Sequence, residues 1–183
     1  HYVGSGRTIF GVVRYGNVMG SRGSVIPLWM KERETGAIPV THREMTRFWI
    51  TLDQGVDFVL MTLRTMQGGE IYVPKIPSMR VTDLVEAVAP GCRIVETGIR
   101  PGEKLHEVMI PADDAVRTLE FDSHYVITPA LNYWKDTNHK DGRAVPERFQ
   151  YSSETNTRWL SVDEMRGLLK KLGYDLKFSM ATA

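Results

Sequence analysis

The sequence has few of the residues that hold small disulfide-bonded or metal-bound domains together. Cys92 is the one cysteine among 183 residues, which excludes an intramolecular disulfide and a zinc site built from several cysteines. The five histidines show no metal-ligand spacing such as H-E-x-x-H. No signal peptide is visible, and a lone cysteine fits a reducing compartment. We therefore expect a cytoplasmic protein without a bound metal.

Long apolar runs and an excess of one charge are also missing. The longest apolar stretches, 9–13 and 56–63, fall far short of the roughly 20 residues that cross a bilayer. Lys and Arg number 23 against 22 Asp and Glu, whereas a protein that binds nucleic acid through phosphate charge needs a concentrated basic excess. With 42% hydrophobic residues, the composition is that of a globular domain or part of one. We expect neither a membrane nor a nucleic acid as partner.

Strands and helices are predicted to alternate, which is typical of an α/β fold. The nearly continuous apolar run at 9–15 predicts a strand buried on both faces. Short strands and long loops are expected across 113–150. The remaining pattern predicts extended segments at 38–42, 47–50, 70–73 and 93–97, and helices at 24–35, 51–66, 82–89 and 161–172.

The helix predicted at 51–66 has the clearest signal. Thr51 and Gln54 form a capping-box pattern at its start, and Ser161 and Glu164 do the same for the last helix. In the helix at 51–66, the apolar side chains recur at i, i+3, i+4 and i+7 spacing, at Val56, Val59, Leu60 and Leu63. This periodicity predicts that they face the protein core.

A glycine-rich loop follows the first predicted strand. Residues 14–24, Arg-Tyr-Gly-Asn-Val-Met-Gly-Ser-Arg-Gly-Ser, run from that strand through the loop to a helix. Open α/β sheets bind ligands beyond the carboxyl ends of strands, and helix-start N–H groups with Arg22 could hold a phosphate. The loop is neither a Walker loop nor a G-x-G-x-x-G fingerprint, and a plain structural turn is the alternative.

Arg47 stands directly before the aromatic pair Phe48-Trp49. Its guanidinium could offer a two-pronged grip to a diphosphate. The alternative is a surface charge packed on aromatic faces.

A second arginine lies in the segment 98–104, Gly-Ile-Arg-Pro-Gly-Glu-Lys. Arg-Pro-Gly predicts a tight turn that presents Arg100 and Glu103 from a rigid loop. Glu103 could accept hydrogen bonds from ribose hydroxyls, or it could pair with Arg100 or Lys104.

Together these motifs resemble those of nucleotide-sugar-modifying extended short-chain dehydrogenases. Arg-Tyr-Gly-Asn-Val (14–18), Met-Thr-Arg-Phe (45–48) and Ile-Arg-Pro-Gly-Glu-Lys-Leu-His-Glu (99–107) are similar to the UDP-N-acetylglucosamine (UDP-GlcNAc) 4,6-dehydratases. The nearest branch is the inverting, 5-epimerising one that starts pseudaminic acid synthesis. His42 departs from that branch, which usually has Asp there, and resembles the retaining dehydratases; an exposed loop residue is the alternative. Further matches to the inverting branch lie at 72–78, 106–111, 119–121, 151–153 and 159–160.

The resemblance implies that part of the family's fold is not encoded here. The family has an N-terminal glycine-rich turn and a Tyr-x-x-x-Lys pair, neither of which occurs in this sequence. We therefore expect 1–183 to be a single C-terminal substrate-binding region that begins within a longer protein. Residues 1–35 would hold the cofactor and substrate loop and the last strands of a Rossmann sheet whose N-terminal half is absent. The strand at 9–15 should then have no parallel neighbour within the chain.

The resemblance also implies roles for individual residues. Asn17 and Arg47 would contact the UDP-sugar and Thr41 its uridine. Arg100 would contact the diphosphate, and Glu103 the ribose or uridine end. None of the residues in the chain is expected to be catalytic. The loop that would pass the nicotinamide end of NADP consists of Val18, Met19, Gly20, Ser21 and Arg22.

The function expected from the resemblance is that of an NADP-dependent UDP-GlcNAc 4,6-dehydratase in bacterial surface-sugar synthesis. The enzyme would act at full length, as a homo-oligomer, and residues 1–183 alone would be inactive. The alternatives are half of a retaining dehydratase or 4-epimerase, and a non-catalytic nucleotide-sugar-binding module.

Overall fold

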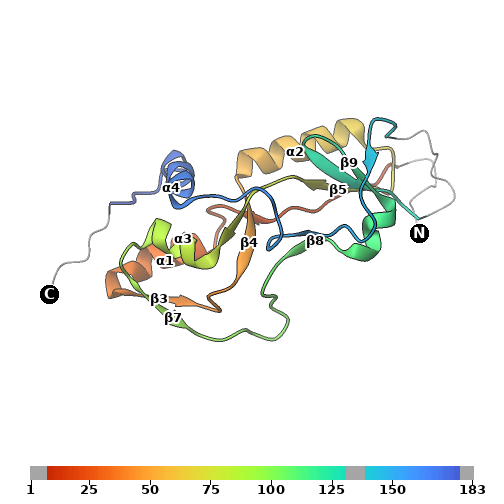
Figure 1. The fold of residues 1–183 in the computed structure, drawn as a ribbon. Helices are drawn as coiled ribbons and strands as arrows, with labels where there is room; N and C mark the ends of the chain where they lie inside the picture. Colours follow the sequence, from red (N-terminus) through yellow and green to blue (C-terminus); the bar gives the residue numbers. More distant parts are fainter. Residues whose placement is uncertain (1–7, 131–138, 178–183) are drawn as a thin grey trace. The chain divides into compact units, whose positions relative to one another are not determined.

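The computed structural model describes residues 8–130 and 139–177, in which strands and helices alternate (Figure 1). The chain divides into two compact units, each assembled from three segments. The first unit takes residues 1–16, 51–76 and 108–152, and the second takes 17–50, 77–107 and 153–183. No helix among the described residues is long and apolar enough to cross a membrane.

The first unit is built on a five-stranded sheet in the order β1-β5-β10-β9-β11. β1 and β5 run parallel, with Val12 opposite Ile71, and the other neighbours are antiparallel. β8 (Val108–Ile110) and β12 (Tyr151–Ser152) form a separate antiparallel pair, and the 3-10 helix η2 spans Ala112–Arg117. The sheet strands are β1 (Val12–Val13), β5 (Ile71–Pro74), β10 (His124–Ile127), β9 (Thr118–Glu120) and β11 (Arg143–Ala144).

The prediction for residues 9–15 was wrong in three respects. Regular strand covers only Val12–Val13, and this strand has a parallel neighbour in the chain, β5. The predicted segment is also not buried on both faces, since the side chains of Ile9 and Val12 are 56% and 53% exposed. β1 lies at the edge of the sheet, so its side chains have a neighbouring strand on one side only and are less covered than those of a central strand.

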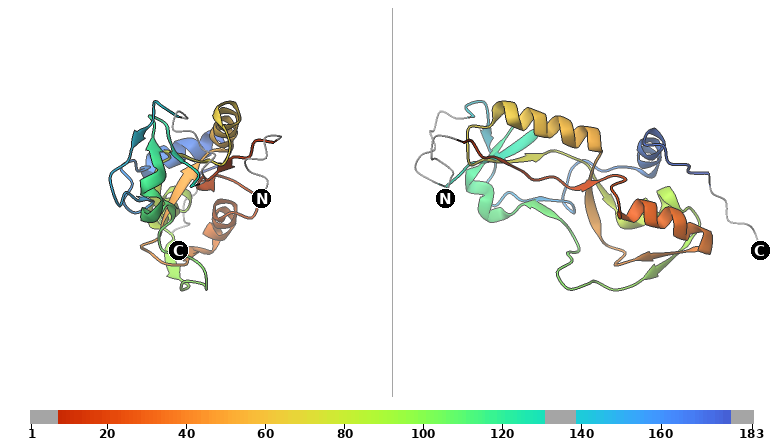
Figure 2. Two further views of the ribbon diagram at one scale, coloured as in Figure 1. Left: turned by 90° about the vertical axis from the view of Figure 1, so that its right-hand side faces the viewer. Right: turned by 180° about the vertical axis from the view of Figure 1, so that it is seen from behind.

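The helix α2 (Leu52–Thr65) begins as predicted, because the side chains of Thr51 and Gln54 each accept a hydrogen bond from the other's backbone N–H. It lies over the five-stranded sheet in Figures 1 and 2, and its Phe58 ring meets the His124 ring of β10. Its apolar stripe, however, is exposed, so the prediction that this stripe faces the core was wrong. We call this stripe the α2 apolar face; it consists of Leu52, Val56, Val59, Leu60 and Leu63.

The exposure of the α2 apolar face predicts self-association. Leu60→Gln combined with Leu63→Gln should raise the dissociation constant for self-association at least about tenfold, because each leucine withdrawn from water contributes about 1.5–3 kcal/mol. The free energy of unfolding should change by less than about 0.5 kcal/mol, as at other exposed positions. Sedimentation velocity and urea unfolding measure the two quantities, with Arg64→Gln on the same helix as control. A loss of stability of several kcal/mol would show that the face is a core.

A buried carboxylate precedes β5. Glu70 is 0% exposed, and its two oxygens accept the backbone N–H groups of Gln67 and Gly68, each at 2.6 Å. Nε2 of His139 lies 3.1 Å from Oε1 of Glu70. Burial alone would raise the pKa of Glu70, but these hydrogen bonds more than offset it, so the pKa lies below its ordinary value. The carboxylate therefore ties the turn before β5 to His139.

This depressed pKa predicts a loss of stability in acid. The contribution of ionised Glu70 is fully present above its ordinary pKa of 4.5 and is lost as the pH falls through the lower folded-state value. Glu70→Gln should remove this part of the pH dependence and lower the free energy of unfolding by roughly 1–3 kcal/mol at neutral pH. The reason is that a glutamine amide has only one acceptor oxygen, whereas each carboxylate oxygen of Glu70 accepts one N–H group. Urea unfolding from pH 3 to 7 measures both effects, with the exposed Glu147→Gln as control. Parallel pH profiles for Glu70→Gln and the unmodified chain would contradict this account.

The second unit holds two smaller sheets and most of the helices. In one sheet β4 (Thr46–Ile50) lies between β2 (Asn17–Val18), to which it is parallel, and β6 (Ser78–Arg80), to which it is antiparallel. In the other, β3 (Ala37–Val40) is parallel to β7 (Arg93–Glu96). Helices α1 (Val25–Glu32), α3 (Val81–Val88) and α4 (Val162–Lys171) and the 3-10 helix η1 (Arg33–Thr35) complete the unit. Its core includes Ile26, Trp29, Ile38, Trp49, Met79, Leu84, Met165 and Leu169.

Candidate functional site

The second unit contains a cavity of about 340 Å³. This volume lies within the range of small-molecule binding sites. Residues from β2, α1, β3, β4 and α3 and from the loop after β7 line it. The apolar part of the wall consists of Val25, Leu28, Trp29, Pro39, Met45, Trp49, Val81 and Leu84, and the polar part of Asn17, Thr41, Arg47, Thr97, Arg100 and Glu103.

The residues predicted from the motifs to contact a UDP-sugar meet at this cavity. Asn17, Thr41, Arg47, Arg100 and Glu103 all line it, although they come from segments far apart in the sequence. A shared binding site requires this convergence. The role of each residue remains a prediction.

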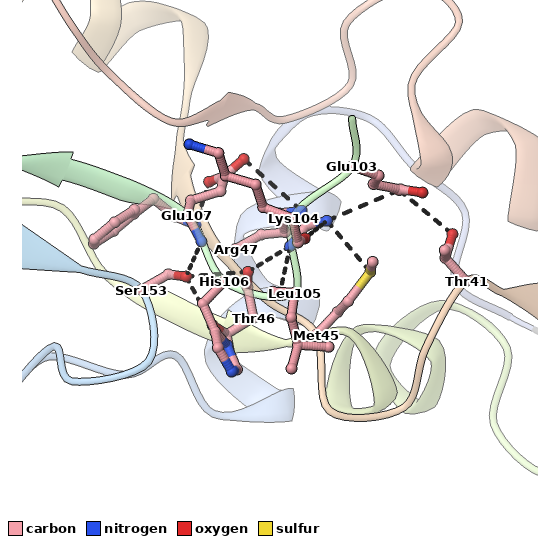
Figure 3. Close-up of polar contacts among 11 residues, drawn as sticks. Thr41, Met45, Thr46, Arg47, Glu103, Lys104, Leu105, His106, Glu107 and Ser153 are labelled. Atoms are coloured by element: carbon pink, nitrogen blue, oxygen red, sulfur yellow. Dashed lines mark hydrogen bonds and ion pairs between the residues drawn. The ribbon is translucent and has the colours of Figure 1, made fainter. Parts of the chain in front are cut away.

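The guanidinium of Arg47 is held by the chain itself (Figure 3). Nη1 donates to the backbone oxygens of Thr46 at 2.8 Å and Leu105 at 3.0 Å, and Nη2 donates to that of Lys104 at 3.0 Å. The side chain is only 13% exposed. Arg47 therefore fastens the segment after the Arg-Pro-Gly turn to the start of β4.

Two carboxylates flank Arg47. Oε1 of Glu103 lies 3.9 Å from Nη2, and Oε1 of Glu107 lies 3.8 Å from Nε. Glu103 also accepts the hydroxyl of Thr41 at 3.5 Å, and Glu107 accepts the backbone N–H of Phe48 at 3.2 Å. Burial raises the pKa of Glu107, although the Phe48 hydrogen bond and the charge of Arg47 oppose this shift. Glu103 is thus the carboxylate that faces the cavity.

Arg100 differs from Arg47 in its surroundings. Its backbone N–H, not its guanidinium, contacts Glu103, with 3.4 Å between nitrogen and Oε2. Within residues 8–130 and 139–177, the Arg100 guanidinium has no hydrogen bond or ion pair. The alternative in which Arg100 braces its loop by pairing with Glu103 is therefore not what the structure shows. The guanidinium of Arg47 holds the loop in place, whereas the guanidinium of Arg100 lies at the cavity wall and can bind an anion.

The loop 18–22, predicted to pass a nicotinamide cofactor, turns at Gly20 with a φ of 72°. The side chain of Met19 is buried in the core of the second unit, so this residue could reach a cofactor only through its backbone. Ser21 and Arg22 are exposed. A hydroxyl and a guanidinium at the surface fit an anionic dinucleotide, so the donor set of this loop is compatible with NADP.

His42 has a local partner. Its Nδ1 accepts the backbone N–H of Glu44 at 3.2 Å, and its Nε2 lies 3.6 Å from a carboxylate oxygen of Glu96. Its side chain is 33% exposed. These contacts fix the turn before β4, and His42 is not among the residues that line the cavity.

Sequence reasoning missed a polar cluster behind Arg47. Oγ1 of Thr46 lies 2.8 Å from Nδ1 of His106 and 2.7 Å from Oγ of Ser153. Thr46 is 3% and Ser153 0% exposed. Thr46, His106 and Ser153 lie in the motifs 45–48, 99–107 and 151–153, but the resemblance assigned a role to none of them. Serine and threonine occur everywhere in proteins, so neither hydroxyl carried a signal of its own.

Comparisons with known proteins agree with the motif assignments. Residues 1–129 match the family model described as "Polysaccharide biosynthesis protein". The "UDP-N-acetylglucosamine 4,6-dehydratase (inverting)" of Campylobacter jejuni is 47% identical over 171 residues, which cover 88% of this chain and 51% of that protein. A UDP-glucose 4-epimerase of Rickettsia akari is 33% identical, covering 92% and 51%. The resemblance to UDP-GlcNAc 4,6-dehydratases is thereby confirmed.

A solved structure shares the fold. The X-ray structure of Pen from Bacillus thuringiensis is similar with a TM-score of 0.76 and 32% identity, covering 92% of this chain and 51% of that one. This similarity confirms the predicted fold class, an α/β fold that is part of a short-chain dehydrogenase. The chain spans about half the length of the curated relatives it matches.

The two arginines of the cavity should differ in their effect on stability. Arg47→Ala should lower the free energy of unfolding by about 1.5–3 kcal/mol, because three backbone carbonyls, two of them in partly buried hydrogen bonds, lose a charged donor. Arg100→Ala should change it by less than about 0.5 kcal/mol. Arg47→Lys should recover only part of the loss, since one ammonium cannot reproduce the fork of donors. Urea unfolding measures all three variants. Equal losses of unfolding free energy in Arg47→Ala and Arg100→Ala would contradict the conclusion that Arg47, and not Arg100, holds the loop.

Proposed function

Because the chain belongs to the polysaccharide biosynthesis protein family, we propose that residues 1–183 bind UDP-GlcNAc as the substrate-binding part of an NADP-dependent UDP-GlcNAc 4,6-dehydratase. The observation that carries this proposal is the cavity wall, where the uncommitted Arg100 guanidinium and the Glu103 carboxylate lie together. The relative from Campylobacter jejuni, a UDP-N-acetylglucosamine 4,6-dehydratase by name, supports the same choice of substrate.

The chemistry of the cavity wall suits the parts of a nucleotide sugar. Arg100 offers a charge and paired N–H donors to the diphosphate, and Glu103 offers acceptors to ribose hydroxyls. Trp29 and Trp49 provide flat apolar surface for a base or the face of a sugar. The Nη1 and Nη2 groups of Arg47 already donate hydrogen bonds to backbone carbonyls. Arg47 would therefore act on the diphosphate mainly through its positive charge and by holding the loop that carries Glu103 in place.

Catalysis would need groups beyond those in this chain. When bound, NADP would supply hydride removal at sugar C4 and hydride return at C6, with water lost across C5–C6. Ser21 and Arg22 would bind and orient the cofactor, and the cavity residues would hold the sugar in register. No Tyr-x-x-x-Lys pair is encoded here, so residues 1–183 alone should be inactive.

We propose four further properties for the full-length enzyme by its resemblance to the inverting dehydratases. The enzyme would invert the sugar at C5, act in pseudaminic acid synthesis, be located in the cytoplasm and form a homo-oligomer. The second candidate is a 4-epimerase, which the 33% identity to the Rickettsia akari protein favours. The two candidates differ in the preferred sugar, because an epimerase of that name acts on UDP-glucose.

Titration calorimetry on residues 1–183 tests the proposal. UDP-GlcNAc should bind, and Arg100→Ala should raise its dissociation constant about 10- to 100-fold. The reason is that a charge-assisted hydrogen bond contributes about 1.5–3 kcal/mol, and about 1.4 kcal/mol corresponds to a tenfold change in the dissociation constant. Arg100→Lys should rescue binding in part, and Arg64→Ala, an exposed arginine of the first unit, should leave it unchanged.

Three outcomes would overturn parts of the proposal. An unchanged dissociation constant in Arg100→Ala would remove Arg100 from the site. Tighter binding of UDP-glucose than of UDP-GlcNAc would favour the epimerase. Product formation from UDP-GlcNAc and NADP by residues 1–183 would show that the chain carries a complete catalytic apparatus.

A further inference from the structure

We propose that the hydroxyl groups of Thr46 and Ser153 are positioning groups for ligand binding: they hold the loop 103–107 in the place where Glu103 and Arg100 can grip a nucleoside diphosphate. Neither residue lines the cavity, so any effect on binding must act through the loop. The inference rests on the proposed binding of a UDP-sugar in this cavity. It gives a function to a cluster whose members lie in the motifs 45–48, 99–107 and 151–153 but to which the sequence assigned no role.

Ser153 ties three parts of the second unit together (Figure 3). Its hydroxyl donates to the backbone oxygen of Thr46 at 3.1 Å and accepts the backbone N–H of Glu107 at 2.9 Å. Its own backbone N–H donates to the carbonyl of Glu107 at 2.8 Å. Glu107 is thus bound through both of its main-chain groups, and the end of the loop 103–107 is fixed.

Thr46 extends this cluster to His106. The single hydroxyl hydrogen of Ser153 goes to the Thr46 carbonyl, so the Thr46 hydroxyl donates to Oγ of Ser153. Nδ1–H of His106 then donates to Oγ1 of Thr46. This chain of hydrogen bonds needs both hydroxyls, so removing either one leaves a buried polar atom without its partner.

The cluster and Arg47 hold the same loop from two sides. The backbone N–H of Thr46 donates to the Leu105 carbonyl at 3.2 Å, and the Arg47 guanidinium donates to the same oxygen at 3.0 Å. Glu103 is the first residue of this loop, and Arg100 lies in the turn before it. A shift at residues 105–107 would therefore move the two side chains that the proposed function assigns to ribose and diphosphate.

Conservative substitutions separate positioning from simple support of the fold. Thr46→Val has nearly the same shape but lacks the hydroxyl, whereas Thr46→Ser keeps it. In titrations of residues 1–183 with UDP, Thr46→Val and Ser153→Ala should each raise the dissociation constant about tenfold, and Thr46→Ser should stay within about twofold. His106→Asn, which keeps a polar atom near the place of Nδ1, should bind UDP more tightly than His106→Ala.

A double-mutant cycle makes the test specific to the loop. If Thr46 acts by placing Arg100, then Thr46→Val should weaken UDP binding much less in an Arg100→Ala background than in the unmodified chain. Thermal unfolding of every variant supplies the control for stability. The His106 variants keep the test possible should Thr46→Val fail to fold, because the His106 side chain is partly exposed, whereas Thr46 is buried.

The outcomes distinguish this inference from the proposed function. Unchanged UDP binding by a folded Thr46→Val or by both His106 variants, with a lowered melting temperature, would overturn the inference and leave the proposed function intact. Equal weakening in both backgrounds would overturn the claim that Arg100 is placed by the cluster. Absence of UDP binding by the unmodified chain would overturn the proposed function, and the inference with it.

Discussion

The hydrogen bonds from the Arg47 guanidinium to the carbonyls of Lys104 and Leu105 hold the cavity wall together. The loop that contributes Arg100 and Glu103 has no regular secondary structure of its own, so its shape depends on such side-chain contacts. A guanidinium suits this task because it presents several donors in one plane and keeps its charge at all ordinary pH values. The nearby carboxylates of Glu103 and Glu107 offset that charge, which makes its partial burial tolerable.

Local signals allowed the helices to be predicted from the sequence. The capping boxes at Thr51 and Ser161 place the starts of α2 and α4, because a capping box joins residues only three positions apart. The periodicity of α2 was also correct as a pattern. What the pattern could not reveal is what the stripe packs against, because that depends on segments distant in the sequence. The same limit explains β1, whose partner β5 lies far along the chain.

The five residues predicted to contact the substrate line one cavity, and their roles stay predictions. Motif resemblance brought the cavity residues together, and the residue types indicated an anion site. The sequence could not distinguish Arg47 from Arg100, because Arg47 binds backbone carbonyls, which every residue possesses and which leave no trace in residue type. The hydroxyls of Thr46 and Ser153 were missed for a related reason. Their importance comes from burial and mutual distance, and neither property is written in a short stretch of sequence.

The way the two units alternate along the chain also constrains the order of folding. The second unit cannot be completed from its first two segments, because α4, with the fully buried Met165 and Leu169, belongs to the third. During synthesis the residues lining the cavity emerge well before Ser153, to which their loop is tied. Long-range contacts of this kind form late and make folding slow. A nascent chain thus acquires a shaped cavity only after the ribosome has passed residue 153 and the helix beyond it.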